Sequence, residues 1–236
     1  MNRVNQLPRP PIRRASLDDD ASLETVSRPI HLLKIDGSPR ASKSNSIALT
    51  DAFVTAYTDA LPSVTVDVLN VWDEKLPEFD NAAIDAKYKG VAGSVMNEAE
   101  TAIWHRIQTL VARFRDADRI VLGVPMWNFA YPYKLKQLID LVSQRNMLFS
   151  YDGERFGPLL QTPRAMVIYT RGQEYREDLP TPPSRFDHQS GYVEFWLDFI
   201  GVQEVRALAV ENTWGDKAEA SMRAARDKVA ALAKDF

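Results

Sequence analysis

From residue 30 onward, short apolar segments alternate with longer segments in which apolar residues recur at helical spacing. The apolar segments are 30–36, 64–72, 118–125, 163–170 and 202–212, and the helical ones include 44–57, 97–117, 191–202 and 216–236. Strands that alternate with helices along the chain imply a parallel sheet that helices cover on both faces. The alternation therefore predicts an α/β fold built around a five-stranded parallel sheet.

Three further segments complete this prediction. Five such strands fit the flavodoxin-like order 2-1-3-4-5, and Pro132 stands in the first turn of another helix, where its missing N–H costs no hydrogen bond. Between residues 146 and 160, Asp152-Gly153 separates two short runs and predicts a small β-hairpin insertion. Residues 1–28 are expected to form a flexible N-terminal extension, or an arm on a neighbouring subunit, ahead of a single flavodoxin-like domain over 29–236.

The composition excludes several classes of site and partner. The chain has no cysteine, which rules out disulfides, thiolate nucleophiles and zinc–thiolate sites and suits a cytoplasmic protein. A net charge of −3 without a basic stripe argues against nucleic acid as a partner. No apolar run approaches the roughly 18 residues of a membrane span, and the three histidines lack the spacing of a metal site.

In flavodoxin-like sheets, ligands bind beyond the carboxyl ends of the strands, near the switch point between strands 1 and 3. The loops after residues 36, 124 and 170 are therefore expected to line one site. The first loop, 36–46, contains neither GxGxxG nor a Walker P-loop. Its polar residues lie between a strand and a helix N-terminus, where free N–H groups and the helix dipole suit a phosphate. They are Ser38, Arg40, Ser42, Lys43, Ser44 and Asn45. The alternative is an N-cap with a solvated turn, which needs one serine.

The second loop, PMWNFAYP at 125–132, is crowded with aromatic residues and prolines. An isoalloxazine ring needs apolar surface on one face and hydrogen bonds along its polar edge. Met126 and Trp127 can supply the surface, and Asn128 with nearby backbone N–H groups can supply the donors. The alternative is that Trp127 and Phe129 simply pack in the core.

The third loop, TRGQEYRE at 170–177, combines small and polar residues. Thr170 and Gly172 allow the backbone to approach a ligand closely, and Gln173 can reach a ring edge. A turn that carries exposed charges is the alternative.

Taken together, these motifs resemble the FMN-dependent NADH azoreductases, which also act as NAD(P)H:quinone oxidoreductases. The resemblance covers residues 30 to 236 and rests on SPRASKSN after strand 1, on PMWNFAYPYKLKQLIDLVSQRNMLFSY, and on FWLDFIGV. It implies one FMN per subunit of a homodimer. The FMN-binding residues it implies are Ser38, Arg40, Ser42, Lys43, Ser44, Asn45, Pro125, Met126, Trp127, Asn128, Phe129, Thr170, Arg171, Gly172 and Gln173.

The same resemblance implies ping-pong hydride transfer through flavin N5, with NADH or NADPH as donor and a quinone or azo compound as acceptor. Asn128 is expected to position the ring, and Trp127 and Tyr151 to stack on the acceptor, with Tyr151 reaching the pocket across the dimer. The chain departs from the family in having Trp127 for a commoner tyrosine, Gln173 for a commoner glycine, and a proline-rich insert at 178–190.

Two other functions remain open at this stage. One is a flavodoxin-like electron carrier or flavin-binding module that does not turn over small molecules. The other is a flavin-free regulatory protein, which the intact serines and Arg40 of the first loop argue against.

Overall fold

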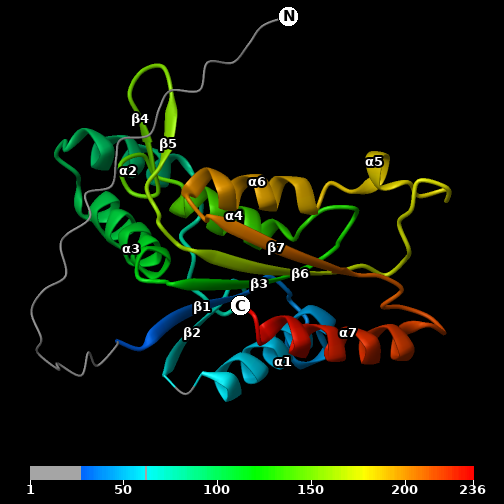
Figure 1. Ribbon diagram of the computed structural model, residues 1–236. Helices are drawn as coiled ribbons and strands as arrows, with labels where there is room; N and C mark the ends of the chain where they lie inside the picture. The colour runs from blue at the N-terminus through cyan, green and yellow to red at the C-terminus, as the bar shows by residue number, and fades with distance from the viewer. Residues whose placement is uncertain (1–27, 62) are drawn as a thin grey trace, which may run out of the picture.

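The computed structural model describes residues 28–61 and 63–236, in which a twisted sheet lies between two layers of helices (Figure 1). Its strands are β1 (Ile30–Asp36), β2 (Val64–Asn70), β3 (Arg119–Pro125), β6 (Arg164–Thr170) and β7 (Glu204–Val210). They pair in parallel in the order β2-β1-β3-β6-β7. Because β6 and β7 are the fourth and fifth strands of this sheet, the order confirms the flavodoxin-like prediction.

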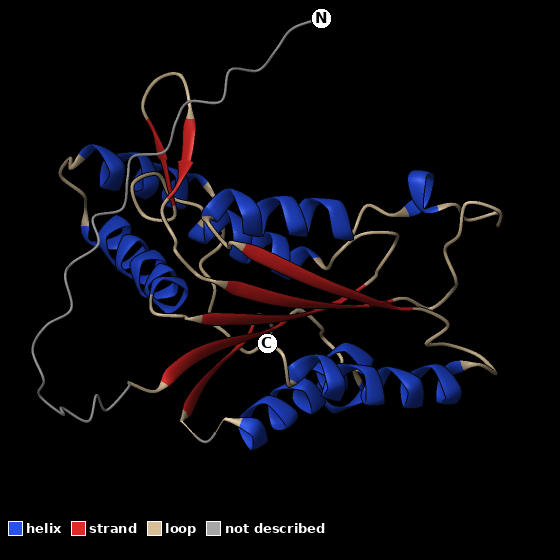
Figure 2. Ribbon diagram, viewed as in Figure 1, coloured by secondary structure: helices blue, strands red, loops and turns tan. Residues whose placement is uncertain are grey.

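Helices cover both faces of the sheet (Figure 2). On one face lie α1 (Asn45–Ala60) and α7 (Ala218–Ala233), and on the other lie α3 (Glu98–Arg115), α4 (Tyr133–Val142) and α6 (Ser190–Ile200), with α2 (Asn81–Ala92) packed on α3. Side chains alternate between the two cores along each strand. In β1, for example, Leu33 and Ile35 belong to the core under α3 and α4, while Leu32 belongs to the core under α1 and α7.

The predicted hairpin is confirmed: β4 (Phe149–Tyr151) and β5 (Phe156–Pro158) pair antiparallel and project from the α3 and α6 side (Figure 1). Two short helices lie beyond the carboxyl ends of the strands, at the end of the sheet away from the hairpin. They are η1 (Ala41–Lys43) after β1 and α5 (Pro183–Phe186) in the proline-rich segment. The predicted N-terminal extension lies outside the described residues, apart from Arg28. No helix of the described residues is long and apolar enough to cross a bilayer.

Local signals fix most of the element ends. The Ser44 hydroxyl caps α1 by accepting from the N–H of Ile47, and Gly201 ends α6 in the left-handed region at φ 113°. The second strand is shorter than predicted because Asn70 closes a turn: its carbonyl accepts from the N–H groups of Asp73 and Glu74. Pro132 occupies the N-cap position of α4 rather than a helical one.

Candidate functional site

A cavity of about 220 Å³ opens where the carboxyl ends of β1, β3, β6 and β7 meet the connections that follow them. Its lining is Ser38, Arg40, Ser44, Asn45, Pro125, Met126, Trp127, Thr170, Gly172, Thr213 and Trp214. Among these described residues the only ionisable group is the Arg40 guanidinium, and there is no carboxylate. The cavity therefore has a positive, hydroxyl-rich end and an apolar, aromatic end.

The positive end is built by the connection from β1 to α1. Gly37 is packed so closely against β3 that a Cβ there would lie 2.9 Å from the Gly123 carbonyl oxygen, so only glycine lets the chain turn at this point. Ser38 follows and is 1% exposed, and its hydroxyl accepts from the N–H of Arg40 at 3.3 Å. Ser44 is 3% exposed and caps α1.

The N-terminus of α1 supplies further donors. Within the described part of the chain, the N–H groups of Asn45 and Ser46, in the first turn of the helix, donate to no protein acceptor. Free N–H groups at a helix N-terminus carry partial positive charge and bind anions. Together with Arg40 and the two buried serine hydroxyls, they form a donor set that fits a phosphate.

A buried ion pair lies behind this loop. Lys34, which is 4% exposed, donates to Asp36 at 2.7 Å and also pairs with Asp51 of α1 at 2.7 Å. Burial raises the pKa of Asp36, and the adjacent Lys34 opposes that shift. The pair ties the end of β1 to α1 and so fixes the base of the loop.

The aromatic end is built by a strained tight turn after β3. Trp127 and Ala130 exchange backbone hydrogen bonds of 2.8 and 3.0 Å, and between them Asn128 and Phe129 have φ of 49° and 69°. Two left-handed residues define a type I′ turn, where asparagine is common and phenylalanine is strained by about 1 kcal/mol. Such strain clusters at functional sites. Here it leaves Trp127 47% exposed and Phe129 43% exposed at the surface.

Arg171 joins the second and third loops from within the protein. It is 5% exposed, and its guanidinium donates to Asp187 at 2.5 Å and to Gln189 at 3.0 Å. Gln189 in turn donates to the carbonyl of Val124 at 2.9 Å. Although burial opposes it, hydrogen bonds from Ser190 and the charge of Arg171 hold the pKa of Asp187 below its ordinary value. We call these three residues, Arg171, Asp187 and Gln189, the Arg171 clamp.

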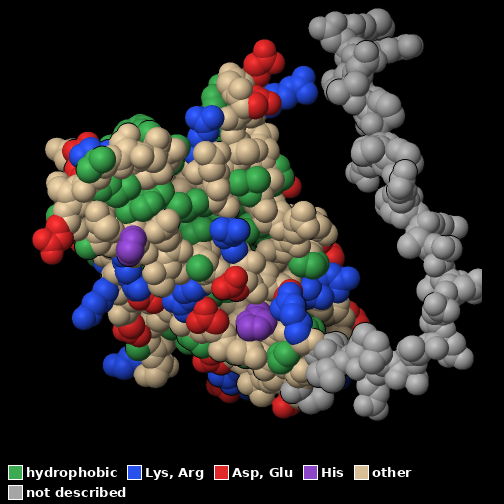
Figure 3. Space-filling view, turned by 90° about the vertical axis from the view of Figure 1, so that its left-hand side faces the viewer, with side chains coloured by type: hydrophobic (Ala, Val, Ile, Leu, Met, Phe, Trp, Pro, Cys, Tyr) green, Lys and Arg blue, Asp and Glu red, His purple; other side chains and the backbone are tan. Residues whose placement is uncertain are grey.

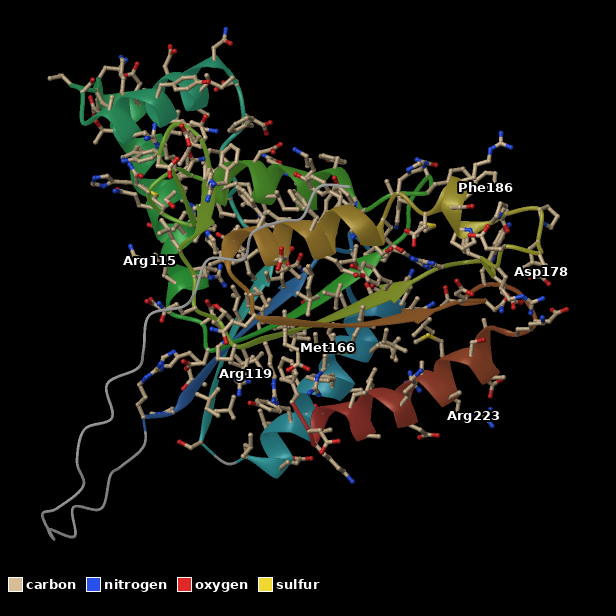
Figure 4. All side chains as sticks on the ribbon, turned by 45° about the horizontal axis from the view of Figure 1, so that its top comes forward. Arg115, Arg119, Met166, Asp178, Phe186 and Arg223 are labelled. Carbon is tan, nitrogen blue, oxygen red and sulfur yellow. The ribbon has the colours of Figure 1, made fainter. Side chains whose placement is uncertain are left out.

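Two residues of the clamp, Asp187 and Gln189, belong to a segment that covers the second loop. The N–H of His188 donates to the carbonyl of Phe129 at 3.0 Å, and the ring of Phe186 in α5 lies 5.2 Å from the ring of Phe129. In Figure 4, Phe186 and Asp178 lie beyond the carboxyl ends of the strands, whereas Arg115 and Arg119 lie at the other edge of the sheet. The proline-rich insert is thus part of the surroundings of the cavity.

The structure brings together nine of the residues expected to bind the cofactor, and these line the cavity. They are Ser38, Arg40, Ser44, Asn45, Pro125, Met126, Trp127, Thr170 and Gly172. Six others lie in the same loops but do not line it, namely Ser42, Lys43, Asn128, Phe129, Arg171 and Gln173. For Arg171 the reason is the clamp, which turns the guanidinium away from the cavity; its role toward a ligand stays a prediction, as do those of the others.

Tyr151 lies in the hairpin, which emerges at the other side of the molecule because α4 carries the chain back from the carboxyl edge (Figure 1). Its hydroxyl donates to the carbonyl of Gly153 at 2.7 Å. Within one chain Tyr151 is therefore not part of the cavity, and the predicted stacking role requires a second subunit.

Two lining residues, Thr213 and Trp214, were not predicted. They follow β7, whose carboxyl end lies at the same edge as those of β3 and β6. The sequence signal was present, because the connection after the last predicted strand, NTWGD, places a tryptophan among turn-forming polar residues. The same reasoning that selected the other three loops applies to this fourth one.

The arrangement fits the expected FMN. A dianionic phosphate matches the serines, Arg40 and the free N–H groups, and a flat ring matches Met126 and Trp127. A volume of about 220 Å³ is below the roughly 300–1,000 Å³ usual for ligand pockets, so part of the nucleotide would stay accessible to a second molecule. No group of three or more potential metal-binding His, Cys, Asp or Glu side chains occurs in the described residues.

Comparisons with known proteins agree with this picture. A family model described as "flavodoxin-like fold" matches residues 31–233. A protein of Burkholderia lata named FMN-dependent NADH:quinone oxidoreductase 2 is 58% identical over 207 residues, which are 88% of this chain and 100% of that protein. A second protein of that organism, FMN-dependent NADH:quinone oxidoreductase 9, is 41% identical over 87% of this chain and 99% of its own length.

Solved structures show the same likeness. The crystal structure of an azoreductase from Bacillus anthracis strain Sterne superimposes with a TM-score of 0.79 at 26% identity, covering 88% of this chain and 100% of that one. A structure of an FMN-dependent NADH-azoreductase from Bacillus anthracis strain Ames Ancestor, in complex with FMN, has a TM-score of 0.80 at 22% identity over 87% and 98% of the two chains. The second match supports the fold alone.

Proposed function

Since this chain belongs to the flavodoxin-like fold family and, within it, to the FMN-dependent NADH:quinone oxidoreductases, we propose that it reduces quinones or azo compounds with NADH or NADPH, using FMN held in the cavity at the carboxyl edge of the sheet. The observation that carries the proposal is the pairing of an anion-binding end with an aromatic end in one cavity at the switch point between β1 and β3. Residues 29–236 act as a single domain.

The first loop binds the FMN phosphate. Ser38, Ser44 and the N–H groups at the start of α1 donate hydrogen bonds to it, and Arg40 adds a positive charge. Ser42, Lys43 and the amide of Asn45 lie in the same loop and complete the predicted set.

The second and third loops hold the ring. Pro125, Met126 and Trp127 offer apolar surface, while Asn128 and Phe129 in the strained turn set the direction of the backbone beneath it. From the third loop, Thr170, Gly172 and Gln173 approach the ring edge, and Arg171 fixes this loop relative to the second through the clamp.

When bound, FMN supplies the hydride chemistry, accepting two electrons from the donor and giving them to the acceptor. The protein contributes position rather than acid or base, since Arg40 is the only ionisable side chain among the described residues that line the cavity. The exposed aromatic side chains of Trp127 and Phe129 provide a surface on which a flat donor or acceptor can stack in turn. Preorganised N–H donors stabilise negative charge that develops on the ring edge.

A visible spectrum tests the proposal. Purified protein should bind FMN, its flavin absorbance should bleach on addition of NADH, and it should recover on addition of menadione or a simple azo dye. Bound flavin that neither NADH nor NADPH can reduce would instead indicate an electron carrier. Protein that takes up no FMN on titration would contradict the proposal altogether.

Replacing Trp127 by alanine is expected to change the reaction with the acceptor more than the binding of FMN. Trp127 is 47% exposed, so its outer surface is available to a second flat molecule, and an aromatic contact is worth about 0.5–1.5 kcal/mol. We expect KM for the quinone to rise about three- to tenfold, while Kd for FMN changes by less. Steady-state kinetics and FMN titration measure the two quantities. A variant that fails to fold would show that Trp127 belongs to the core.

The chain acts as a homodimer, and a stripe of aromatic rings supports this part of the proposal. Tyr131 stacks on Tyr192 at 5.4 Å, and the rings of Phe195 and Phe199 lie 5.8 Å apart. The stripe continues into the hairpin, where Phe156 is 64% exposed and lies 5.8 Å from Phe199. Burial also raises the pKa of Tyr131 to about 12. In Figure 3, hydrophobic side chains gather beside the base of the projecting hairpin. A second copy covers this stripe and brings its Tyr151 toward the cavity.

The dimer is tested by Phe195→Asp, which places a charge in the stripe. Phe195 is 58% exposed in one chain, so the monomer should fold normally. Sedimentation equilibrium should show a dimer for wild type and a monomer for the variant, with Tyr88→Ala, at a site that is 68% exposed on α2, as a control that stays dimeric. A wild-type protein that sediments as a monomer would refute this part of the proposal. The cytoplasm, which holds NADH and NADPH, is the compartment in which the enzyme works.

A further inference from the structure

The fourth loop of the cavity, which follows β7, carries the most exposed tryptophan of the described residues. Trp214 lines the cavity and is 78% exposed, against 47% for Trp127. A single exposed apolar side chain needs no explanation in itself. What distinguishes Trp214 is that the backbone on both sides of it is firmly held.

Thr213 anchors the loop to two of the other walls. Its N–H and its hydroxyl donate to the carbonyl of Arg171 at 3.0 and 2.8 Å, and its own carbonyl accepts from the side chain of Asn45 at 3.3 Å. Asn212 and Gly215 flank the pair in the left-handed region, at φ of 54° and 78°. Strain at a residue such as Asn212 persists only where its surroundings hold it in place. Trp214 is thus presented to the cavity by an ordered backbone.

The position of Trp214 complements that of Trp127. The connection that holds Trp127 leads to α4 on one face of the sheet, and the connection that holds Trp214 leads to α7 on the other face (Figure 2). Thr170 and Gly172 also line the cavity, at the end of β6, which lies between β3 and β7 in the sheet. A Cβ at Gly172 would already lie within 3.8 Å of the Trp214 Cβ, so the two loops are in contact. A ligand at the carboxyl edge therefore has one tryptophan on each side.

From this placement we infer that Trp214 is a flavin-binding residue that covers the ring and ribityl part of the cofactor from the α7 side. The inference rests on the proposed function, because it concerns the same cavity. It assigns the contact to the uncharged part of the ligand, since Trp214 has one N–H donor and no charge to offer a phosphate. The phosphate stays with the serines, Arg40 and the α1 N-terminus.

Titration of flavin-free protein with FMN and with riboflavin, which lacks the phosphate, tests the assignment. Trp214→Ala should weaken the binding of both ligands by the same factor, about tenfold, because it removes the aromatic face on which the flavin ring stacks. Trp214→Phe should restore both affinities to within about threefold, since it keeps an aromatic face. Tyr88→Ala, at another exposed aromatic site distant from the cavity, should leave both unchanged. Quenching of flavin fluorescence gives each Kd.

Each outcome has a distinct meaning. If Trp214→Ala binds both ligands as wild type does, or loses affinity for FMN alone, the inference is wrong while the proposed function stands. If wild type binds no FMN, the proposed function itself fails. Should Trp214→Ala not fold, fluorine NMR on wild type with 5-fluorotryptophan decides, using Trp214→Phe for assignment: the Trp214 resonance should shift on addition of FMN, and an unchanged resonance would overturn the inference.

Discussion

Flavin-free protein that carries Ser44→Asp is expected to bind FMN at least about a thousandfold more weakly than wild type. The substitution places a carboxylate at the phosphate end of the cavity, where Ser44 is 3% exposed. Two like charges 4 Å apart near a protein surface repel by about 4 kcal/mol, and about 1.4 kcal/mol corresponds to a tenfold change in Kd. Aspartate remains a good N-cap residue, so α1 should keep its cap and the fold should survive.

Two further measurements separate the effect of the added charge from the effect of losing the Ser44 hydroxyl. Ser44→Ala removes the cap and one hydroxyl donor without adding charge, so it should weaken FMN far less than Ser44→Asp does. Riboflavin, which has no phosphate, should bind Ser44→Asp nearly as well as it binds wild type. Isothermal titration or flavin fluorescence gives the affinities, and a circular dichroism melt checks the fold. Equal FMN affinity of Ser44→Asp and wild type would remove the first loop from the phosphate site.

Arg171→Met is expected to destabilise the protein more than any exposed substitution in the same region. Arg171 is 5% exposed, and its removal leaves Asp187 and Gln189 without their buried partner. Breaking one side of a buried ion pair costs about 3–5 kcal/mol. With a shift of about 2–4 °C per kcal/mol for a domain of this size, the melting temperature should fall by roughly 6–20 °C.

Arg176→Met provides the matched control. Arg176 also pairs with two carboxylates, Glu174 and Asp178, but its side chain is 55% exposed, so its ion pairs are worth about 0–1 kcal/mol. Both variants are melted without flavin. An Arg171→Met protein that melts within a degree or two of wild type would show that the clamp contributes nothing.

At acid pH, wild type should lose its greater stability against unfolding relative to Arg171→Met. The pKa of Asp187 is lowered in the folded protein, so the stability that the clamp contributes is present above the ordinary carboxyl pKa of 3.8 and is lost as pH falls through the lower folded value. The difference in unfolding free energy between the two proteins should therefore be constant near neutral pH and shrink below about pH 4.

The spacing of apolar residues and the capping residues at helix ends were sufficient to predict the fold. Each strand of the sheet is a short, mainly apolar segment between amphipathic helices, and Ser44 and Gly201 mark helix ends by local hydrogen bonding and backbone conformation alone. The small errors in the predicted ends of strands and helices arise where hydrogen bonds in a turn hold the backbone. At Asn70, for example, the turn that ends β2 two residues early depends on hydrogen bonds that apolar patterning does not encode.

The candidate site was predictable in its location and less so in its side chains. Parallel strands present their carboxyl ends at one edge, so three of the four loops could be identified from their order in the sequence. The direction of Arg171 could not, because its partners Asp187, Gln189 and Glu211 lie 16, 18 and 40 residues away along the chain. The loop that holds Thr213 and Trp214 follows the fifth strand and ends at the same edge, so the same rule of strand order applies to it.

The central claim is that the connections after β1, β3 and β6 hold one flat, phosphorylated ring. A crystal structure of the protein grown with excess FMN tests it most directly. The account predicts electron density for the phosphate among Ser38, Arg40 and Ser44, with the ring system lying against Met126 and Trp127. Density that shows the cavity filled by the Trp127 side chain, or FMN bound elsewhere on the protein, would contradict it.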